Sequence, residues 1–301
     1  MQGHKRILFF DLLRIICVFF VVNGHFTFWL FASISGILFL TGWSYMEIYP
    51  LTASMLAVYG LIIVSGAVME YNYSEIRKFS EYKLFVLKRF FRLYPAYWMS
   101  LIFGLAIAGG YFNVSLTSLF LQFSGLFIFT QNGDWSPDTI NIMGWFIPTI
   151  FFLYLLFPLL SKAVKNHPYP SMAVSLIITF VSRYILIHYT ILPGWAPWRW
   201  FPLCNLFEFC LGIYIVRMSL YPKNSVDHPV IAELADFTFY IFIFHVVVIQ
   251  NIIYFLDFHR NLYNFPILYN SLLCAEILGV SALAMILDKK LQKIIRIRLL
   301  L

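Results

Sequence analysis

Long apolar stretches recur along almost the whole chain, and they constrain its fold more than any other feature of the sequence. Crossing the roughly 30 Å hydrocarbon core of a bilayer takes about 20 residues, within a range of about 17 to 25. Most of the stretches suit that length, whereas 32–48 and 115–130 are marginal. The stretches cover residues 7–31, 32–48, 51–69, 93–112, 115–130, 142–161, 171–188, 202–216, 237–257 and 265–287. This pattern predicts a helical membrane protein.

The composition excludes an ordinary soluble domain. Hydrophobic residues make up 61% of the 301 positions and charged residues only 12%, against about 25% charged residues in an average soluble domain. So few charged side chains cannot cover a protein of this length with a polar surface. We therefore predict an all-α fold, a polytopic membrane helical bundle of eight to ten transmembrane helices, with residues 1–301 forming one membrane-embedded domain.

The positions of lysine and arginine predict the orientation. The densest basic run, 71–92, contains Arg77, Lys78, Lys83, Lys88, Arg89 and Arg92, and the positive-inside rule places it in the cytoplasm with the N-terminus. An even number of crossings must separate the N-terminus from this basic run. Since 7–31 and 51–69 supply two crossings, 32–48 folds back or lies in the outer interface. The same parity makes 115–130 re-entrant or interfacial. Eight spans result, with both termini cytoplasmic, in a multi-pass protein of the plasma membrane; ten full crossings, with 71–92 outside, is the less favoured arrangement.

The net charge of +7 would suit a nucleic-acid partner only if the basic residues shared one soluble face. Because nearly all of them fall in loops on one side of a membrane, we expect a lipid bilayer as the partner and no nucleic acid. Cys17, Cys204, Cys210 and Cys274 lie inside apolar stretches at spacings that suggest no metal site. We expect them to pack in the protein, and we expect no bound metal.

Charged side chains inside the first apolar stretch mark a candidate catalytic site, because each costs about 2.5 to 3.5 kcal/mol on insertion scales. Asp11 and Arg14 stand three positions apart on a helix and can neutralise each other near the inner boundary. His25 follows Arg14 by eleven residues, which returns it to the same helix face roughly 16 Å further along. The three form one polar stripe, although a histidine considered alone is more often satisfied by a neighbour.

The end of the basic run is a candidate binding site for phosphates. Lys88, Arg89 and Arg92 directly precede Leu93, Tyr94 and Pro95, which the pattern places at the start of a helix. Two arginines one turn apart at a cytoplasmic helix mouth suit forked hydrogen bonds to phosphate oxygens. For basic loops in general, a topological anchor is the simpler explanation.

Five blocks of the sequence resemble the acyltransferase-3 family of integral-membrane acyltransferases. RILFFDLLRIICVFFVVNGHF (6–26) resembles the opening signature of the family, with Arg14 and His25 separated by ten residues as in that pattern. KRFFRLYPAYW (88–98) is similar to the family's Arg-x-x-Arg-Leu-Tyr-Pro-x-Tyr-Trp. The remaining blocks follow in family order and are GLIIVSGAVM (60–69), GWFIPTIFFLYLLFP (144–158) and FTFYIFIFH (237–245).

The resemblance implies transfer of an acyl group, commonly acetyl, from cytoplasmic acyl-CoA to a hydroxyl of a carbohydrate, lipid-linked sugar or other envelope acceptor on the far side. It implies that His25 is the essential histidine and that Arg14 belongs to the same motif. It also implies that Arg89 and Arg92 hold the CoA donor. In this interpretation acyl-CoA is a donor co-substrate, and Asp11 and Lys88 support the two sites.

Two departures from the family pattern stand out. Many members carry Trp-Ser-Leu-x-x-Glu in the fourth block, whereas here Trp145 is followed by Phe146, Ile147, Pro148 and Thr149, without an acid. The interval between His25 and Ser65 is also longer than the pattern leads us to expect.

The chemistry of His25 remains open between two routes. A neutral imidazole can act as general base toward the acceptor hydroxyl, or it can carry the acyl group itself. A donor for the thioester oxygen could come from Asn23, Tyr97 or Arg183.

Further polar residues lie in or between the apolar stretches. Glu208 and Glu276 are expected to pair with an arginine or another polar group. His245 is expected to make a structural hydrogen bond or, alternatively, to take part in catalysis. Trp195, Trp198 and Trp200, with Arg199, form an interfacial belt or, alternatively, stack on a sugar ring. The rival class is a transporter or flippase in which Asp11, Arg14, Arg183, Glu208 and Glu276 line a path.

Overall fold

The fold described here comes from a computed structural model. It describes residues 6–26, 53–73, 76–108, 114–130, 139–189, 199–222, 228–250 and 266–299. Within these ranges every regular element is an α-helix or a 3₁₀ turn, which confirms the predicted all-α membrane bundle.

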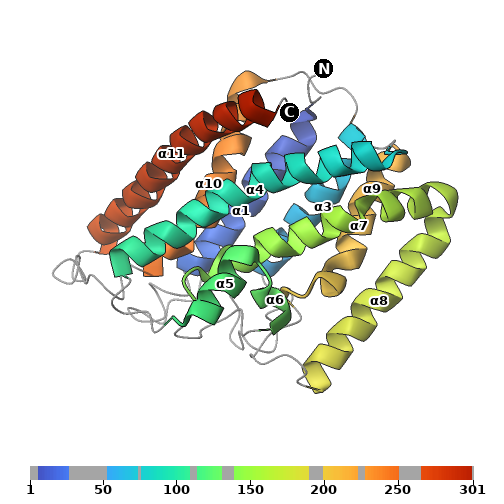
Figure 1. Cartoon of the computed structure of the whole chain (residues 1–301), viewed down its shortest axis with the longest axis horizontal. Helices are drawn as coiled ribbons and strands as arrows, with labels where there is room; N and C mark the ends of the chain where they lie inside the picture. The colour runs from blue at the N-terminus through green and yellow to red at the C-terminus, as the bar shows by residue number, and fades with distance from the viewer. Residues whose placement is uncertain are drawn as a thin grey trace. The chain divides into compact units, whose positions relative to one another are not determined.

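The helices follow the apolar stretches of the sequence (Figure 1). Seven of the described helices are long and apolar enough to cross a membrane, as predicted from seven of the stretches. The α-helices are α1 (Leu8–Phe26), α3 (Ala53–Tyr73), α4 (Phe79–Ala108), α5 (Leu116–Ser124), α6 (Phe127–Thr130), α7 (Phe146–Asn166), α8 (Pro168–His188), α9 (Leu206–Arg217), α10 (Pro229–Gln250) and α11 (Pro266–Leu299). Two 3₁₀ turns, η4 (Ile142–Trp145) and η6 (Pro202–Asn205), precede α7 and α9.

The eighth predicted span, 202–216, does not form a helix of spanning length. Its α-helical part, α9, has 12 residues, which is about 18 Å at the usual rise per residue. The first four residues form η6 instead. The prediction of one long helix here was wrong in length.

The basic run 71–92 is also helical in its second half, contrary to the predicted loop. Helix α4 begins at Phe79, so Pro95 lies inside it and not at its start. The side chain of Glu81 accepts hydrogen bonds from the backbone N–H groups of Arg77 and Lys78 at 2.9 and 3.1 Å. A glutamate three positions into a helix satisfies otherwise unbonded N–H groups in this way, which explains the early start.

The marginal stretch 115–130 is broken into two short helices, as expected for a segment that does not cross as one helix. Ser115 caps the start of α5 by accepting from the N–H of Ser118. Gly125 ends α5 with a φ of 80°, a left-handed conformation that glycine adopts without steric cost. The other marginal stretch, 32–48, lies outside the described residues.

The chain divides into two compact units that alternate along the sequence. Unit 1 comprises 1–75, 156–178 and 205–242, and unit 2 comprises 76–155, 179–204 and 243–301. Each is described below by itself, and the single domain remains a prediction.

In unit 1, helix α3 contacts both α1 and α9 (Figure 1). Glycines permit the closest approaches: a methyl group at Gly66 would overlap the carbonyl of Phe209, and one at Gly212 would overlap that of Ile63. Small residues at helix contacts let backbones approach closely in a membrane, where packing rather than the hydrophobic effect drives association.

In unit 2, α11 runs beside α4 (Figure 1). Pro95 has no N–H, so the carbonyl of Phe91 loses its usual partner within α4. The side-chain amide of Gln292 on α11 donates to that carbonyl. The proline in the helix therefore creates an acceptor that a neighbouring helix uses.

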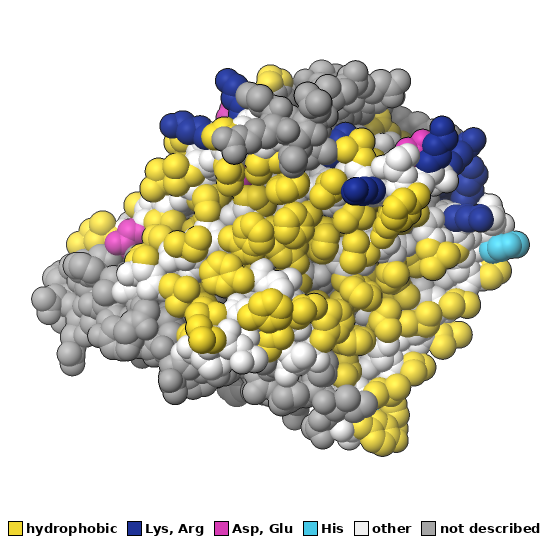
Figure 2. Space-filling model, in the orientation of Figure 1, with side chains coloured by type: hydrophobic (Ala, Val, Ile, Leu, Met, Phe, Trp, Pro, Cys, Tyr) yellow, Lys and Arg dark blue, Asp and Glu magenta, His cyan; other side chains and the backbone are white. Residues whose placement is uncertain are grey.

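Hydrophobic side chains cover much of the described surface that faces the viewer in Figure 2. On α8 the exposed ones include Ile177, Phe180 and Ile187. A surface of this kind suits hydrocarbon and not water, in agreement with the apolar composition.

Candidate functional site

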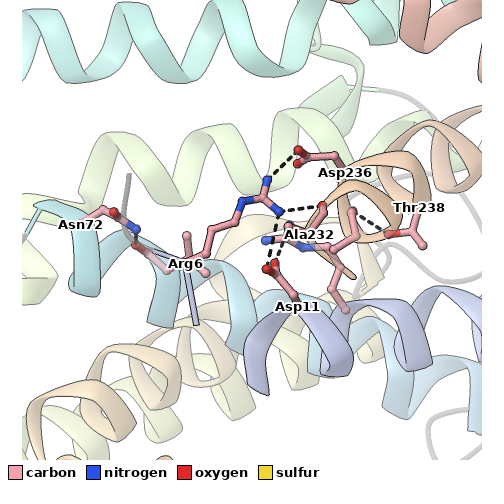
Figure 3. Close-up of polar contacts among 9 residues, drawn as sticks. Arg6, Asp11, Asn72, Ala232, Asp236 and Thr238 are labelled. Atoms are coloured by element: carbon pink, nitrogen blue, oxygen red, sulfur yellow. Dashed lines mark hydrogen bonds and ion pairs between the residues drawn. The ribbon is translucent and has the colours of Figure 1, made fainter. Parts of the chain in front are cut away.

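The charged end of α1 is held by a network that reaches α10 (Figure 3). Arg6 Nη2 donates to Asp236 Oδ2 at 2.6 Å, and its Nη1 donates to the carbonyl of Ala232 at 2.7 Å. The same Nη1 lies 3.5 Å from Asp11 Oδ2. Arg6 therefore links the carboxylate of Asp11 on α1 to that of Asp236 on α10. Within unit 1, this link holds the start of α1 against α10.

The predicted pair of Asp11 and Arg14 is confirmed, with 3.8 Å between Asp11 Oδ1 and Arg14 Nη1. Asp11 is buried and offers one oxygen to each arginine. Two arginines and two aspartates balance in charge, which lowers the cost of placing them at the edge of a membrane. Sequence reasoning missed Asp236 because the contact joins positions 230 residues apart.

His25 lies near the other end of α1, half-buried. Its Nδ1 is 2.8 Å from the carbonyl oxygen of Val21. A carbonyl only accepts, so Nδ1 carries a proton and a neutral ring keeps its lone pair on Nε2. The neighbouring Gly24 has no room for a side chain, since a Cβ there would lie 2.6 Å from that of Ser54 on α3. This close helix contact fixes the backbone beside His25.

A second charged network in unit 1 was not predicted. Glu70 on α3 is 2% exposed, and its carboxylate pairs with Arg217 on α9 and accepts from Ser161 on α7 at 2.6 Å. Arg217 Nη2 also donates to Ser161 Oγ at 3.3 Å. The network joins three helices at their ends. Glu70 follows the apolar stretch 51–69 directly, so a carboxylate at the boundary of a span was the signal available.

The candidate donor-binding residues, Lys88, Arg89 and Arg92, all lie half-buried on α4. They sit about three turns into that helix, so the predicted helix mouth beside Pro95 was wrong. Unpaired N–H groups at a helix start therefore do not assist them. They belong to unit 2, whereas His25 belongs to unit 1, so a site shared by the two groups remains a prediction.

The aromatic residues that follow these arginines have a structural role. Tyr97, Trp98 and Tyr94 donate to three successive carbonyls at the end of α5, those of Gln122, Phe123 and Ser124, at 2.7, 2.8 and 3.2 Å. The last carbonyls of a helix have no partner within it. The Leu-Tyr-Pro-x-Tyr-Trp block thus holds the broken stretch 115–130 against α4.

The structure describes most of the other polar residues that the sequence indicated as candidates. Tyr97 donates its one O–H proton to the carbonyl of Gln122, so this contact already occupies that candidate oxyanion donor. Arg183 donates its Nε–H to the carbonyl of Cys204 at 2.9 Å. Asn23 lies half-buried two residues before His25. Glu208 and His245 are buried and Glu276 is half-buried.

Trp200 does not belong to an interfacial belt, contrary to the favoured prediction. It is fully buried, so its ring is also not exposed for stacking on a sugar. Arg199 is buried as well, with its guanidinium carbon 6.0 Å from the centre of the Trp200 ring. Trp195 and Trp198 lie outside the described residues.

Comparison of the sequence with models of known protein families gives one match. Residues 7–229 match the model of the acyltransferase-3 family, described as an acyltransferase domain. This range includes Asp11, Arg14, His25 and the run from Lys88 to Trp98. No curated protein and no solved structure matches the chain significantly.

Proposed function

Because the chain belongs to the acyltransferase-3 family, we propose that this membrane acyltransferase takes its acyl group from acyl-CoA, with acetyl as the group. We propose a hydroxyl of a carbohydrate or other envelope molecule, on the side of the membrane opposite the donor, as the acceptor. The family match over 7–229 carries this proposal.

His25 is proposed as the residue that handles the transferred proton or acyl group. The acceptor oxygen forms a bond to the acyl carbon, the carbon–sulfur bond breaks, and CoA leaves as a thiol. In the general-base route, Nε2 takes the hydroxyl proton and returns it to the leaving sulfur. In the relay route, Nε2 first bonds to the acyl carbon and the hydroxyl then displaces it. The bond from Nδ1 to Val21 supports both routes, because it leaves the lone pair on Nε2.

The basic residues on α4 are proposed to bind the donor, and those at the start of α1 to form a separate charged group. Arg89, Arg92 and Lys88 offer positive charge and forked donors for the phosphates of CoA. Asp11 is proposed to orient Arg14, since its carboxylate lies between the guanidinium groups of Arg6 and Arg14.

Release of free thiol from acetyl-CoA by the purified protein, with a membrane extract as acceptor source, tests the function. We expect His25→Ala to lower the rate by about 100-fold or more, because proton transfer by a positioned side chain contributes about 10² to 10⁴. His167→Ala, at an exposed histidine between α7 and α8, is the matched control and should retain the rate. Equal rates for His25→Ala and the wild type would exclude this role for His25.

The donor assignment has its own measurement. Arg89→Gln and Arg92→Gln should raise KM for acetyl-CoA at least several-fold, since each removes a charged donor. Lys290→Gln, at an exposed lysine on α11, is the control. Unchanged KM in both arginine variants would contradict the assignment.

A further inference from the structure

Two buried indole N–H groups stand out in unit 2. Trp145 is 2% exposed and Trp200 is 0% exposed. Their Nε1 atoms are buried, and neither has a hydrogen-bond partner in the part of the chain that the structure describes. A buried donor without an acceptor loses its hydration and gains nothing in return. Two such donors therefore require an explanation.

The two tryptophans are neighbours although they lie 55 positions apart. The Oγ1 of Thr149 is 2.8 Å from the carbonyl oxygen of Trp145 and 2.5 Å from that of Trp200. Thr149 lies in the first turn of α7, Trp145 ends η4, and Trp200 lies two residues before the start of η6. Both backbone carbonyls therefore lie within reach of one hydroxyl, so the two tryptophan backbones are side by side.

The chemistry of this cluster is that of a donor site. An indole N–H donates and cannot accept, and the buried guanidinium of Arg199 next to the Trp200 ring is also a donor group. The hydroxyl of Thr149 has one proton, so it donates to one of the two carbonyl oxygens at a time. The two indole N–H groups need an acceptor, and a carbonyl oxygen of a ligand only accepts. The cluster therefore suits a carbonyl.

We propose that Trp145 and Trp200 form a subsite that binds a carbonyl oxygen of the acyl donor through their indole N–H groups. This inference rests on the proposed function, because it takes acyl-CoA as the ligand. Acyl-CoA offers two kinds of carbonyl, the thioester of the acyl group and the amides of the arm that carries the sulfur. Binding at the thioester would also stabilise the negative charge that develops on its oxygen.

Trp145→Phe and Trp200→Phe test the subsite, because each removes the N–H and keeps an aromatic ring. Replacing a buried indole by phenyl leaves a cavity, so without added ligand each variant should melt lower than the wild type, and this melting temperature is the baseline for the ligand response. Trp98→Phe is the matched control: its N–H donates to the carbonyl of Phe123 at 2.8 Å, outside the proposed subsite, so this variant should keep the thermal shift that acetyl-CoA causes in the wild type. If Trp145→Phe and Trp200→Phe both keep that shift as Trp98→Phe does, the proposal falls.

Ligand response provides the second readout, with acetyl-CoA and S-ethyl-CoA as probes. S-ethyl-CoA has the same arm but no thioester carbonyl. If the subsite binds the thioester, both variants lose most of the thermal shift caused by acetyl-CoA and keep that caused by S-ethyl-CoA. If it binds the arm, they lose both. In the thioester case thiol release should also fall by about 100-fold, the loss typical of removing one such donor.

The outcomes separate this inference from the function on which it rests. If the wild type responds to acetyl-CoA and both variants respond equally well, the subsite is excluded while the acyltransferase proposal stands. If the wild type responds to neither compound, acyl-CoA is not the donor and the subsite falls with it.

Discussion

At the scale of single residues, ion pairs hold the start of α1, and the sequence predicted only the pair of Asp11 and Arg14. Asp11 and Arg14 are three positions apart, so helical spacing predicted their contact, which the structure confirms. The contact of Arg6 with Asp236 joins two distant positions, and no local pattern indicates it. Local spacing predicts pairs on one helix, whereas pairs between helices follow from packing.

Replacing Arg6 tests how strongly this network holds the start of α1. Arg6→Gln removes the bridge between two carboxylates and should lower the free energy of unfolding by about 1.5 to 3 kcal/mol, the range for hydrogen bonds to charged groups. Lys290→Gln serves as control, and unfolding is followed in detergent micelles by loss of helical circular dichroism. Equal stability of the two variants would mean that Arg6 does not anchor the helix.

At the scale of elements, the helices follow the apolar stretches but their ends do not. The apolar stretch 93–112 marks where hydrocarbon begins, whereas α4 begins earlier, at Phe79, because Glu81 caps it. A helix can continue beyond the bilayer, since its backbone bonds need no lipid. Conversely, the 3₁₀ turn η6, which begins at Pro202, shortens α9 inside an apolar stretch. Hydropathy therefore predicts where lipid lies and only approximately where a helix ends.

The hydrogen bonds that join α4 to the end of α5 can be tested at Tyr97. Tyr97→Phe removes the side-chain donor of the Gln122 carbonyl, which still accepts from the N–H of Gly125, and should cost about 0.5 to 1.5 kcal/mol of unfolding free energy, the net value of one hydrogen bond. Tyr169→Phe removes a hydroxyl from an exposed ring on α8 and should change little. Thermal melts of both variants compare the two hydroxyls. A loss no greater than that of the control would show that α5 is held by other contacts.

The contact of α3 with α9 offers a test with an internal control. Gly66→Ala places a methyl group against the Phe209 carbonyl, which belongs to the backbone and cannot rotate away. The helices must separate, at a cost of about 1 to 3 kcal/mol. At Gly279 on α11 no atom lies within 4 Å of an added Cβ, so Gly279→Ala should be neutral or slightly stabilising, since alanine favours helix. Equal melting temperatures would contradict the tight contact.

At the scale of the whole molecule, the family match and the apolar helices agree on a membrane acyltransferase. The motif residues could be found from the sequence because their spacing repeats a family pattern. The tryptophan pair could not, because Trp145 and Trp200 are 55 positions apart and come together at Thr149 through packing. Whether Trp200 is buried also depends on how its neighbours pack around it. In the sequence, the cluster of tryptophans around Arg199 suggested a membrane interface instead.

The number of crossings is decided at η6 and α9, because this segment is short. Its 16 residues, 202–217, extend at most about 26 Å, from rises of about 2.0 and 1.5 Å per residue. A bilayer can thin locally to accept such a segment. The basic residues favour a crossing. By the positive-inside rule, Lys162 and Lys165 near the end of α7 and Arg217 at the end of α9 should lie inside, and α8 should take the chain out between them.

We therefore expect the chain to return through 202–217 and to end in the cytoplasm after α11. A reporter that fluoresces only in the cytoplasm, fused to the N-terminus or to the C-terminus, should give signal in both fusions. The same reporter inserted after His167 should also fluoresce, whereas one inserted after Tyr189 should stay dark. A dark C-terminal fusion with a fluorescent N-terminal one would mean an odd number of crossings. In that case α9 would enter the membrane without crossing it, and the lysines at the end of α11 would lie outside.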